Sequence, residues 1–304
     1  MISSLWTNPG DLAAAMADSA KAVDAVIDRL LAQPDGPEAR VYEAMRYAAL
    51  APGKRLRPFL VLASSHLFGV SSRSALQAAV AIEMVHTYSL IHDDLPAMDD
   101  SDLRRGRPTC HKAFDDATAI LAGDGLLTMA FEVLADPDTH GDAVVRAELV
   151  SALAKAAGPA GMVGGQMIDL LAEHDATLDI GAITRLQRLK TGALIAFSCE
   201  AGAILGKSSL DNRKALVGYA HDLGLAFQIA DDLLDAEGTA AETGKSVQRD
   251  AEAGKATFVS ILGLEGARKQ ARALVEQAGR HLEPFGDKAD LLRKAADFVV
   301  ERRS

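Results

Sequence analysis

Apolar residues recur at helical spacing along almost the whole chain, and this periodicity constrains the fold more than any other feature. We find no stretch with the strict alternation of a convincing strand or hairpin. The composition agrees, because 49% of the residues are hydrophobic but only 5% are aromatic, which favours packed helices over sheets. We therefore expect an all-α fold. The expected helices span residues 11–33, 38–50, 55–69, 73–95, 115–135, 142–157, 159–173, 180–206, 211–236, 257–283 and 287–302.

Proline and glycine residues mark the breaks between these helices, and no break is long enough to be an interdomain linker. The 304 residues could form two domains by length alone, but one helical domain over residues 1–304 fits equally well, and we expect the single domain. The stretch 236–256 is polar, charged and glycine-containing, and it follows an aspartate cluster. We interpret it as a mobile loop at a functional site, with an ordinary surface connection as the alternative.

The charge of the chain limits its partners. A formal net charge of -10 argues against nucleic acid or an anionic membrane as a general partner, because both attract basic surfaces. The two cysteines, Cys110 and Cys199, suggest neither a disulfide framework nor a zinc site. The first twenty residues hold no Lys or Arg, and no stretch approaches eighteen apolar residues, so we expect no export signal and no membrane span. A cytoplasmic protein is the expectation.

Two aspartate clusters end apolar helical runs. In the second cluster, Asp231 and Asp235 are about 40° apart around a helix, so both carboxylates can share one cation. In the first, Asp93 and Asp99 are about 120° apart on an ideal helix and would not converge. Pro96 should end or bulge the helix and bring Asp99 back over Asp93. Oxygen ligands without His or Cys point to Mg²⁺, although acidic residues at a helix end are often only a solvated face.

Two basic segments complement these acidic clusters. Gly53-Lys54-Arg55-Leu56-Arg57-Pro58 places three cations at the start of a helix, where free N–H groups and the helix dipole also favour an anion. Leu103-Arg104-Arg105-Gly106-Arg107 adds three more directly after the first aspartates. A solvated basic turn is the alternative for the first segment. Opposite charges clustered this tightly in an acidic chain indicate a bound metal diphosphate.

These residues resemble the trans-prenyl diphosphate synthases, in particular the bacterial farnesyl diphosphate synthases, over nearly the whole chain. The basic segment Gly53 to Pro58 looks like the isopentenyl diphosphate motif of the family, and the first aspartate cluster looks like its first aspartate-rich motif. The remaining matches follow in the order of the family: Leu103-Arg104-Arg105-Gly106, Gly164-Gly165-Gln166-Met167-Ile168-Asp169, Lys190-Thr191-Gly192, Phe227-Gln228, Asp231-Asp232-Leu233-Leu234-Asp235, Gly244-Lys245 and Gly254-Lys255.

The resemblance implies a single large helical bundle around a deep central pocket, usually as a homodimer, and a reaction that joins isopentenyl diphosphate to an allylic diphosphate with about three Mg²⁺ ions. It also implies roles for individual residues. The metal ligands would be Asp93, Asp99 and Asp231, with Asp169 as a second-tier candidate. The allylic diphosphate would be held by Arg104, Lys190, Lys245 and Lys255. Isopentenyl diphosphate would be bound by Lys54, Arg57, His86 and Arg105.

The resemblance further implies that the backbone carbonyl of Thr191 and the side chain of Gln228 lie near a developing allylic cation. Tyr88 and Ser89, one turn before the first aspartate, would form a floor that limits the product to fifteen carbons. A twenty-carbon product, geranylgeranyl diphosphate, is the alternative. Two further alternatives are a terpene cyclase, against which Lys54 and Arg57 argue, and a noncatalytic synthase subunit, which is expected to lose aspartates that this chain keeps.

Overall fold

The computed structural model describes residues 5–8, 10–172, 179–237 and 257–301, and these residues are overwhelmingly helical. The all-α expectation is therefore confirmed. The helices are α1 (Leu12–Leu30), α2 (Ala39–Ala49), α3 (Leu56–Leu67), α4 (Ser72–Asp93), α5 (Cys110–Ala113), α6 (Asp116–Ala135), α7 (Ala143–Ala157), α8 (Met162–Ala172), α9 (Ile180–Gln187), the π-helix η2 (Arg188–Gly192), α10 (Ala193–Leu205), α11 (Leu210–Glu237), α14 (Phe258–His281), the 3-10 helix η3 (Glu283–Ala289) and α15 (Asp290–Glu301).

Several of the helices begin at a side chain that caps their first turn. The side chains of Asp11, Ser71, Asp115, Asp142 and Thr257 each accept a hydrogen bond from a backbone N–H of the helix that follows. Such caps satisfy donors that have no partner within the helix. The helix ends consequently lie within a few residues of the positions that the sequence predicts.

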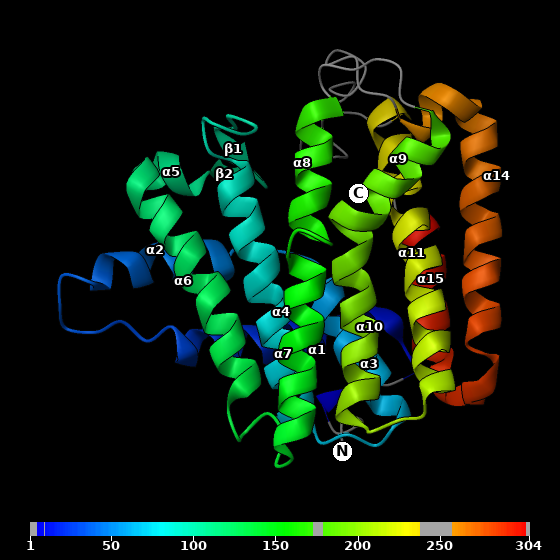
Figure 1. The fold of residues 1–304 in the computed structure, drawn as a ribbon, viewed down its shortest axis with the longest axis horizontal. Coiled ribbons are helices and arrows are strands. Elements are labelled where there is room, and N and C mark those ends of the chain that lie inside the picture. The colour runs from blue at the N-terminus through cyan, green and yellow to red at the C-terminus, as the bar shows by residue number, and fades with distance from the viewer. Residues whose placement is uncertain (1–4, 9, 173–178, 238–256, 302–304) are drawn as a thin grey trace.

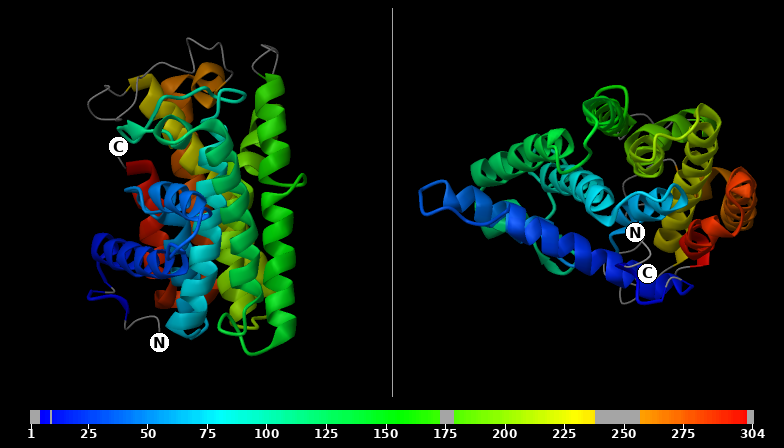
Figure 2. Two further views of the ribbon diagram at one scale, coloured as in Figure 1. Left: turned by 90° about the vertical axis from the view of Figure 1, so that its left-hand side faces the viewer. Right: turned by 90° about the horizontal axis from the view of Figure 1, so that it is seen from below.

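The long helices stand side by side as a bundle, as Figure 1 shows. α7 and α8 follow one another along one side of the bundle, while α1 and α2 cross it transversely, and the two further views in Figure 2 agree. α3 and α10 are the most enclosed of the described helices. Four consecutive residues of α3, Phe59 to Leu62, are fully buried, which happens only when a helix has neighbours on all sides. α4 packs on α3 and α6, and α10 packs on α3, α7 and α11.

A second, smaller apolar cluster lies where α9, α11 and α14 meet, and it includes Ile183, Ile229 and Phe258. It joins the start of α14 to the later part of α11. The C-terminal ends of α4 and α11 point toward the same end of the bundle, the end that carries the hairpin at the top of Figure 1. The fold therefore brings the two aspartate clusters to one end of the molecule.

The described residues include a short hairpin that the sequence does not predict. Strands β1 (Leu103–Arg104) and β2 (Arg107–Pro108) pair antiparallel, with Arg104 opposite Arg107. The two turn residues, Arg105 and Gly106, both have positive φ (52° and 74°), as tight hairpin turns require. Two-residue strands are too short to show alternation, which is why the pattern analysis misses them.

Among the described residues, α6 alone is long and apolar enough to cross a membrane by length and composition. Of the residues in its apolar window, 44% are buried inside the fold, and a core helix of a soluble protein passes the same test. The expectation that no segment spans a membrane stays a prediction.

Candidate active site

Arg55, at the start of α3, is part of the support of the site. It adopts a left-handed backbone conformation (φ 48°) as the N-cap of α3, and its side chain is buried. The guanidinium donates to the carboxylates of Glu83 (2.6 Å) and Asp24 (2.9 Å) and to the carbonyl oxygen of Ala49 (2.7 Å). A buried charge requires such partners. Of the three cations in this segment, Arg55 thus holds the turn, and Lys54 and Arg57 are the two that the sequence assigns to a ligand.

Arg57 and His86 form the centre of a basic pocket. The Nη1 atom of Arg57 lies 3.4 Å from Nε2 of His86, and Nε of Arg57 is buried without a hydrogen-bond partner among the described residues. Burial lowers the pKa of His86 well below its usual value, and Arg57, Arg105 and Arg104 lower it further. His86 is therefore neutral at pH 7. Cations this close together favour an anionic ligand between them.

The hairpin brings Arg105 to the same place. Its Nη1 atom donates to the carbonyl oxygen of Pro52 at 2.6 Å. A Cβ atom at Gly53 would overlap that guanidinium, so a side chain at this position would move Arg105 away from its present place. Burial lowers the pKa of Arg57 and the charge of Arg105 lowers it further, whereas Glu83 and Asp231 oppose the shift. The structure thus brings together Arg57, His86 and Arg105, three of the four residues predicted to bind isopentenyl diphosphate.

The first aspartate cluster folds as its proline predicts. α4 ends at Asp93, and the backbone N–H of Asp99 donates to the carbonyl oxygen of Asp93 at 2.8 Å, so the chain turns Asp99 back. Burial raises the pKa of Asp93 to about 6, and the charges of Asp99 and Asp94 act in the same direction, against Lys190 and Arg104. A carboxyl with this pKa lacks full compensation for its charge. It is a suitable position for a cation.

Arg104 forms a bidentate ion pair with Asp94. Its Nε and Nη2 atoms each donate to a different carboxylate oxygen of Asp94 at 2.7 Å, and Asp94 is 2% exposed. The sequence assigns Arg104 to the allylic diphosphate and gives Asp94 no role. The structure shows instead that Asp94 fixes Arg104 beside Asp93.

Lys190 and Thr191 lie on the π-helix η2, between α9 and α10. The sequence predicts one uninterrupted helix there, and the structure corrects this expectation. Lys190 Nζ donates to the carboxylate of Asp169 on α8 at 2.6 Å, and its charge lowers the pKa of Asp93. A Cβ atom at Gly165 would overlap the backbone N of Lys190, so Gly165 lets α8 lie directly against η2. Asp169, predicted as a second-tier metal ligand, is paired with Lys190.

The second aspartate cluster lies near the C-terminal end of α11. Asp231 and Asp235 are half-buried, and Asp231 lies close enough to Arg57 to oppose the lowering of its pKa. Asp232 is 5% exposed and accepts from the backbone N–H of Phe258 at 2.9 Å and from Nε2 of Gln228 at 3.2 Å. The hydroxyl of Thr191 in turn donates to Oε1 of Gln228 at 3.5 Å. Thr191 and Gln228, predicted to lie near the reacting carbons, are therefore neighbours.

Tyr88 and Ser89 are on the last turns of α4. Tyr88 is 6% exposed, and its ring packs edge-on against the ring of His92 with 5.7 Å between centroids. Burial and the charge of Asp93 raise the pKa of Tyr88 to about 12. Ser89 donates its hydroxyl to the carbonyl oxygen of His86 at 2.9 Å. Tyr88 therefore lies near Asp93, whereas the hydroxyl of Ser89 bonds to its own helix.

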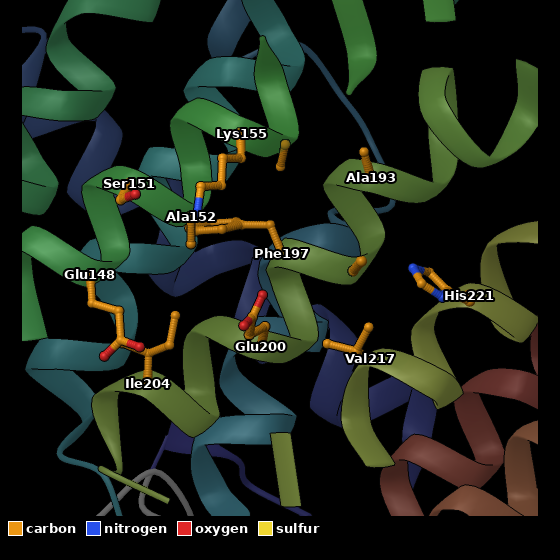
Figure 3. A pocket seen from close by; sticks show the side chains of 12 residues that line it. Glu148, Ser151, Ala152, Lys155, Ala193, Phe197, Glu200, Ile204, Val217 and His221 are labelled. Atoms are coloured by element: carbon orange, nitrogen blue, oxygen red, sulfur yellow. The ribbon is translucent and has the colours of Figure 1, made fainter. Parts of the chain in front are cut away.

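Some predicted residues lie elsewhere. Lys245 and Lys255, and most of the predicted loop 236–256, are outside the described residues. In the part of the chain that the structure describes, no three His, Cys, Asp or Glu side chains form a ready metal site. A cavity of about 450 Å³ between α7, α10 and α11, shown in Figure 3, contains none of the predicted site residues.

Two residues support the site although the sequence pattern gives them no role, Asp94 and Asp232. Asp94 and Asp232 were treated as extra acidic residues, although the second member of an aspartate pair on a helix must point about 100° away from the first. Gln166, within the motif Gly164 to Asp169, has a buried Nε2 atom without a hydrogen-bond partner among the described residues.

Known proteins with similar sequences belong to the family that these site residues indicate. The family model described as polyprenyl synthetase matches residues 38–294. The chain is 45% identical to the farnesyl diphosphate synthase of Escherichia coli K12 over 290 residues, covering 93% of this chain and 96% of that protein. It is 41% identical over 271 residues to the geranylgeranyl diphosphate synthase of Cyanophora paradoxa, covering 89% and 90%.

Two solved structures are similar over nearly their whole length. A protein described as an FPP/GFPP synthase from Zymomonas mobilis superposes with a TM-score of 0.89 at 54% identity, covering 95% of this chain and 99% of that one. A geranyltransferase from Legionella pneumophila superposes with a TM-score of 0.84 at 33% identity, covering 95% and 96%.

Proposed function

Since the chain belongs to the polyprenyl synthetase family, we propose that it is a prenyltransferase that condenses isopentenyl diphosphate head to tail with dimethylallyl and geranyl diphosphate, giving farnesyl diphosphate. One observation carries the proposal at the level of the site. Carboxylates from α4 and α11 and cations from α3, the hairpin and η2 meet at one end of the bundle. Such a site suits two diphosphates, one of which leaves.

The substrates would occupy the two basic parts of this site. Lys54, Arg57, His86 and Arg105 would bind isopentenyl diphosphate, because Arg57, His86 and Arg105 lie near the start of α3 and its free N–H groups. Lys54 stands two residues before α3, and its Nζ atom lies 5.9 Å from the ring centroid of Phe298. Arg104 and Lys190 would hold the allylic diphosphate beside Asp93, together with Lys245 and Lys255 from the segment outside the described residues. Arg57 and His86 contact one another, so a single anion can engage both.

Mg²⁺ is the metal that the donor set fits. Asp93, Asp99 and Asp231 offer only oxygen ligands, and the raised pKa of Asp93 indicates carboxylate charge that a cation would offset. These carboxylates would hold Mg²⁺ together with a bound diphosphate, because Mg²⁺ prefers carboxylate and phosphate oxygens as ligands. Asp93 and Asp99 would hold two ions from one wall and Asp231 a third from the facing wall. Bound there, Mg²⁺ would neutralise charge on the leaving diphosphate.

The residues of the chain would supply positioning and electrostatics. Arg104 and Lys190 would stabilise the charge that develops as the allylic C–O bond breaks. The carbonyl groups of Thr191 and Gln228 would face the resulting cation while the double bond of isopentenyl diphosphate attacks it. His86 is neutral and is buried among cations, so it is a poor proton acceptor for the final step. The proton would leave with the departing diphosphate.

A longer product is the second candidate, because the chain is similar both to a geranylgeranyl diphosphate synthase and to a protein described as an FPP/GFPP synthase. Purified protein, labelled isopentenyl diphosphate and each allylic primer in turn would decide between them, with chromatography of the products. We expect a fifteen-carbon product and loss of turnover when EDTA removes divalent metal. Turnover that survives EDTA would contradict the metal assignment, and no condensation with any primer would contradict the function.

We also propose that the chain forms one domain over residues 1–304, assembles as a homodimer and works in the cytoplasm. The family match over residues 38–294 and the coverage of the relatives support the single domain. Light scattering coupled to size-exclusion chromatography would test the assembly. A mass near 32.0 kDa would indicate a monomer and would contradict the homodimer.

A further inference from the structure

Asp232 has a position that its motif does not explain. It is only 5% exposed, and among the described residues its carboxylate accepts hydrogen bonds from a backbone N–H and a side-chain amide. Oδ2 accepts from the backbone N–H of Phe258 at 2.9 Å, and Oδ1 accepts from the Nε2 atom of Gln228 at 3.2 Å. Gln228 lies one helical turn before Asp232, so the two side chains share a face of α11.

These contacts determine which way the amide of Gln228 points. A carboxylate can only accept hydrogen bonds, so the amide must turn its NH₂ group toward Asp232. Its carbonyl oxygen is then directed away, toward the hydroxyl of Thr191 at 3.5 Å on the π-helix. If the amide were inverted, the carbonyl would face the carboxylate of Asp232 and the two oxygen groups would repel each other.

We propose that Asp232 is a positioning residue, which fixes the amide of Gln228 with its carbonyl oxygen toward Thr191 and the reacting carbons. The inference rests on the proposed function, because it concerns the orientation of a group beside the allylic cation. Asp231, the preceding residue, points about 100° away around the helix and keeps its separate assignment to the metal. The two adjacent aspartates of this cluster therefore act on different parts of the reaction.

The same carboxylate also ties α11 to the first residue of α14. Phe258 is buried in the cluster formed by α9, α11 and α14, which makes this tie a rigid one. It follows Lys255, a predicted diphosphate ligand, by only three positions in the sequence. A variant of Asp232 could thus act through Gln228 or through the start of α14, and the experiment must separate the two.

The substitution Asp232→Asn separates them. Oδ1 of the new amide can still accept from Phe258, which keeps the tie to α14. Its NH₂ group then faces the NH₂ group of Gln228, so Gln228 must invert and present a donor to Thr191. We expect kcat to fall about 10- to 100-fold, the range for residues that orient catalytic groups, with KM for both substrates nearly unchanged.

A transposed pair provides the decisive test. In Asp232→Asn/Gln228→Glu, the new Asn NH₂ donates to one oxygen of the new Glu, and the other oxygen accepts from Thr191. The pair keeps its net charge and its hydrogen bonds, with only the carboxylate and the amide exchanged. We expect this double variant to have a higher kcat than either single variant. Gln228→Glu alone places two carboxylates together and should be poorly active.

Asp222→Asn is the matched control. Asp222 also lies on α11 and also ties it to α14, since its carboxylate accepts from Nε2 of Gln277 at 3.3 Å and lies 3.2 Å from Nε2 of His281. None of these residues belongs to the proposed site. We expect this variant to keep the wild-type kcat. Equal losses of kcat in Asp222→Asn and Asp232→Asn would show that both variants act through the packing of α11 on α14 and not through Gln228, and would overturn the inference.

Nuclear magnetic resonance gives a readout that does not depend on turnover. In wild-type protein labelled with ¹⁵N-glutamine, the Nε2 protons of Gln228, identified by their absence in Gln228→Leu, should exchange slowly with water. Their exchange should be faster in Asp232→Asn and unchanged in Asp222→Asn. Rapid exchange in the wild type would overturn the inference even if Asp232→Asn failed to fold. A wild-type chain without prenyl transfer would contradict the proposed function alone, because the resonance would still report the orientation.

Discussion

The two aspartate pairs, Asp93-Asp94 on α4 and Asp231-Asp232 on α11, have the same sequence but different supports. In each pair the first residue is half-buried and the second is almost completely buried. Asp94 is held by the guanidinium of Arg104, whereas among the described contacts Asp232 binds an amide and a backbone N–H. Consecutive residues on a helix point about 100° apart, so only one member of each pair can face the ligand. In each pair, the first carboxylate is therefore the one placed to bind a ligand, and the second one holds neighbouring residues of the site in position.

The largest expected effect concerns the first member of each pair. Asp93→Ala and Asp231→Ala should each lower turnover by roughly 10²- to 10³-fold or more, because each removes a principal electrostatic stabiliser. Helix content measured by circular dichroism should not change, since neither residue belongs to the apolar core. Near-normal turnover in either variant would contradict the metal assignment and would show that the two pairs are not equivalent.

The next largest effect concerns the ion pair between Arg104 and Asp94. Arg104→Met leaves the carboxylate of Asp94 buried without its partner, which should lower the free energy of unfolding by about 3 kcal/mol, at the low end for a broken buried ion pair. Denaturant titration would measure it. Arg107→Met is the control on the same hairpin, because Arg107 lies over the Tyr47 ring, 4.4 Å from its centroid, and pairs with no buried carboxylate among the described residues. A loss below about 1 kcal/mol for Arg104→Met would mean that solvent compensates Asp94.

A smaller effect should distinguish the binding site of isopentenyl diphosphate from that of the allylic diphosphate. Arg57→Ala should raise KM for isopentenyl diphosphate about tenfold to a hundredfold, because a hydrogen bond to a charged group contributes about 1.5–3 kcal/mol. KM for the allylic primer should stay the same, since Arg57 belongs to the part of the site around His86. Steady-state kinetics with each substrate varied in turn would check this. Equal weakening of both substrates would show that the two diphosphate positions have been separated wrongly.

The smallest effect on rate, and the most specific one, concerns Tyr88 below the first pair. Tyr88→Ala should shift the product from farnesyl toward geranylgeranyl diphosphate or longer, because it removes a buried ring one turn before Asp93. Turnover and metal dependence should remain. An unchanged product distribution at normal activity, measured by chromatography, would remove Tyr88 as the floor.

The positions of the helices could be predicted from the sequence, because apolar periodicity and capping side chains are both local patterns. The sequence was also sufficient for the turn after Asp93, where one proline explains why Asp99 folds back. The sequence could not show the ion pairs that hold the site residues in place, because those pairs depend on which elements pack against each other. Asp94 meets Arg104 and Asp169 meets Lys190 only after the hairpin and α8 have packed. The hairpin itself is too short to leave a pattern in the sequence.

The π-helix η2 explains how the continuous helical segment formed by α9, η2 and α10 can pack against two different apolar clusters. Ile183 and Leu186 on α9 are buried, and Ile183 belongs to the cluster with α11 and α14, whereas Leu194 and Ile195 on α10 belong to the main core. A π-turn holds about one residue more than an α-turn, which shifts the angular phase of all later residues by about 100°. Losing one residue between 188 and 192 would restore a regular helix but rotate α10 out of phase with α9. The extra residue thus changes which side of the helix the later residues face. Lys190 and Thr191 lie at the position of this change.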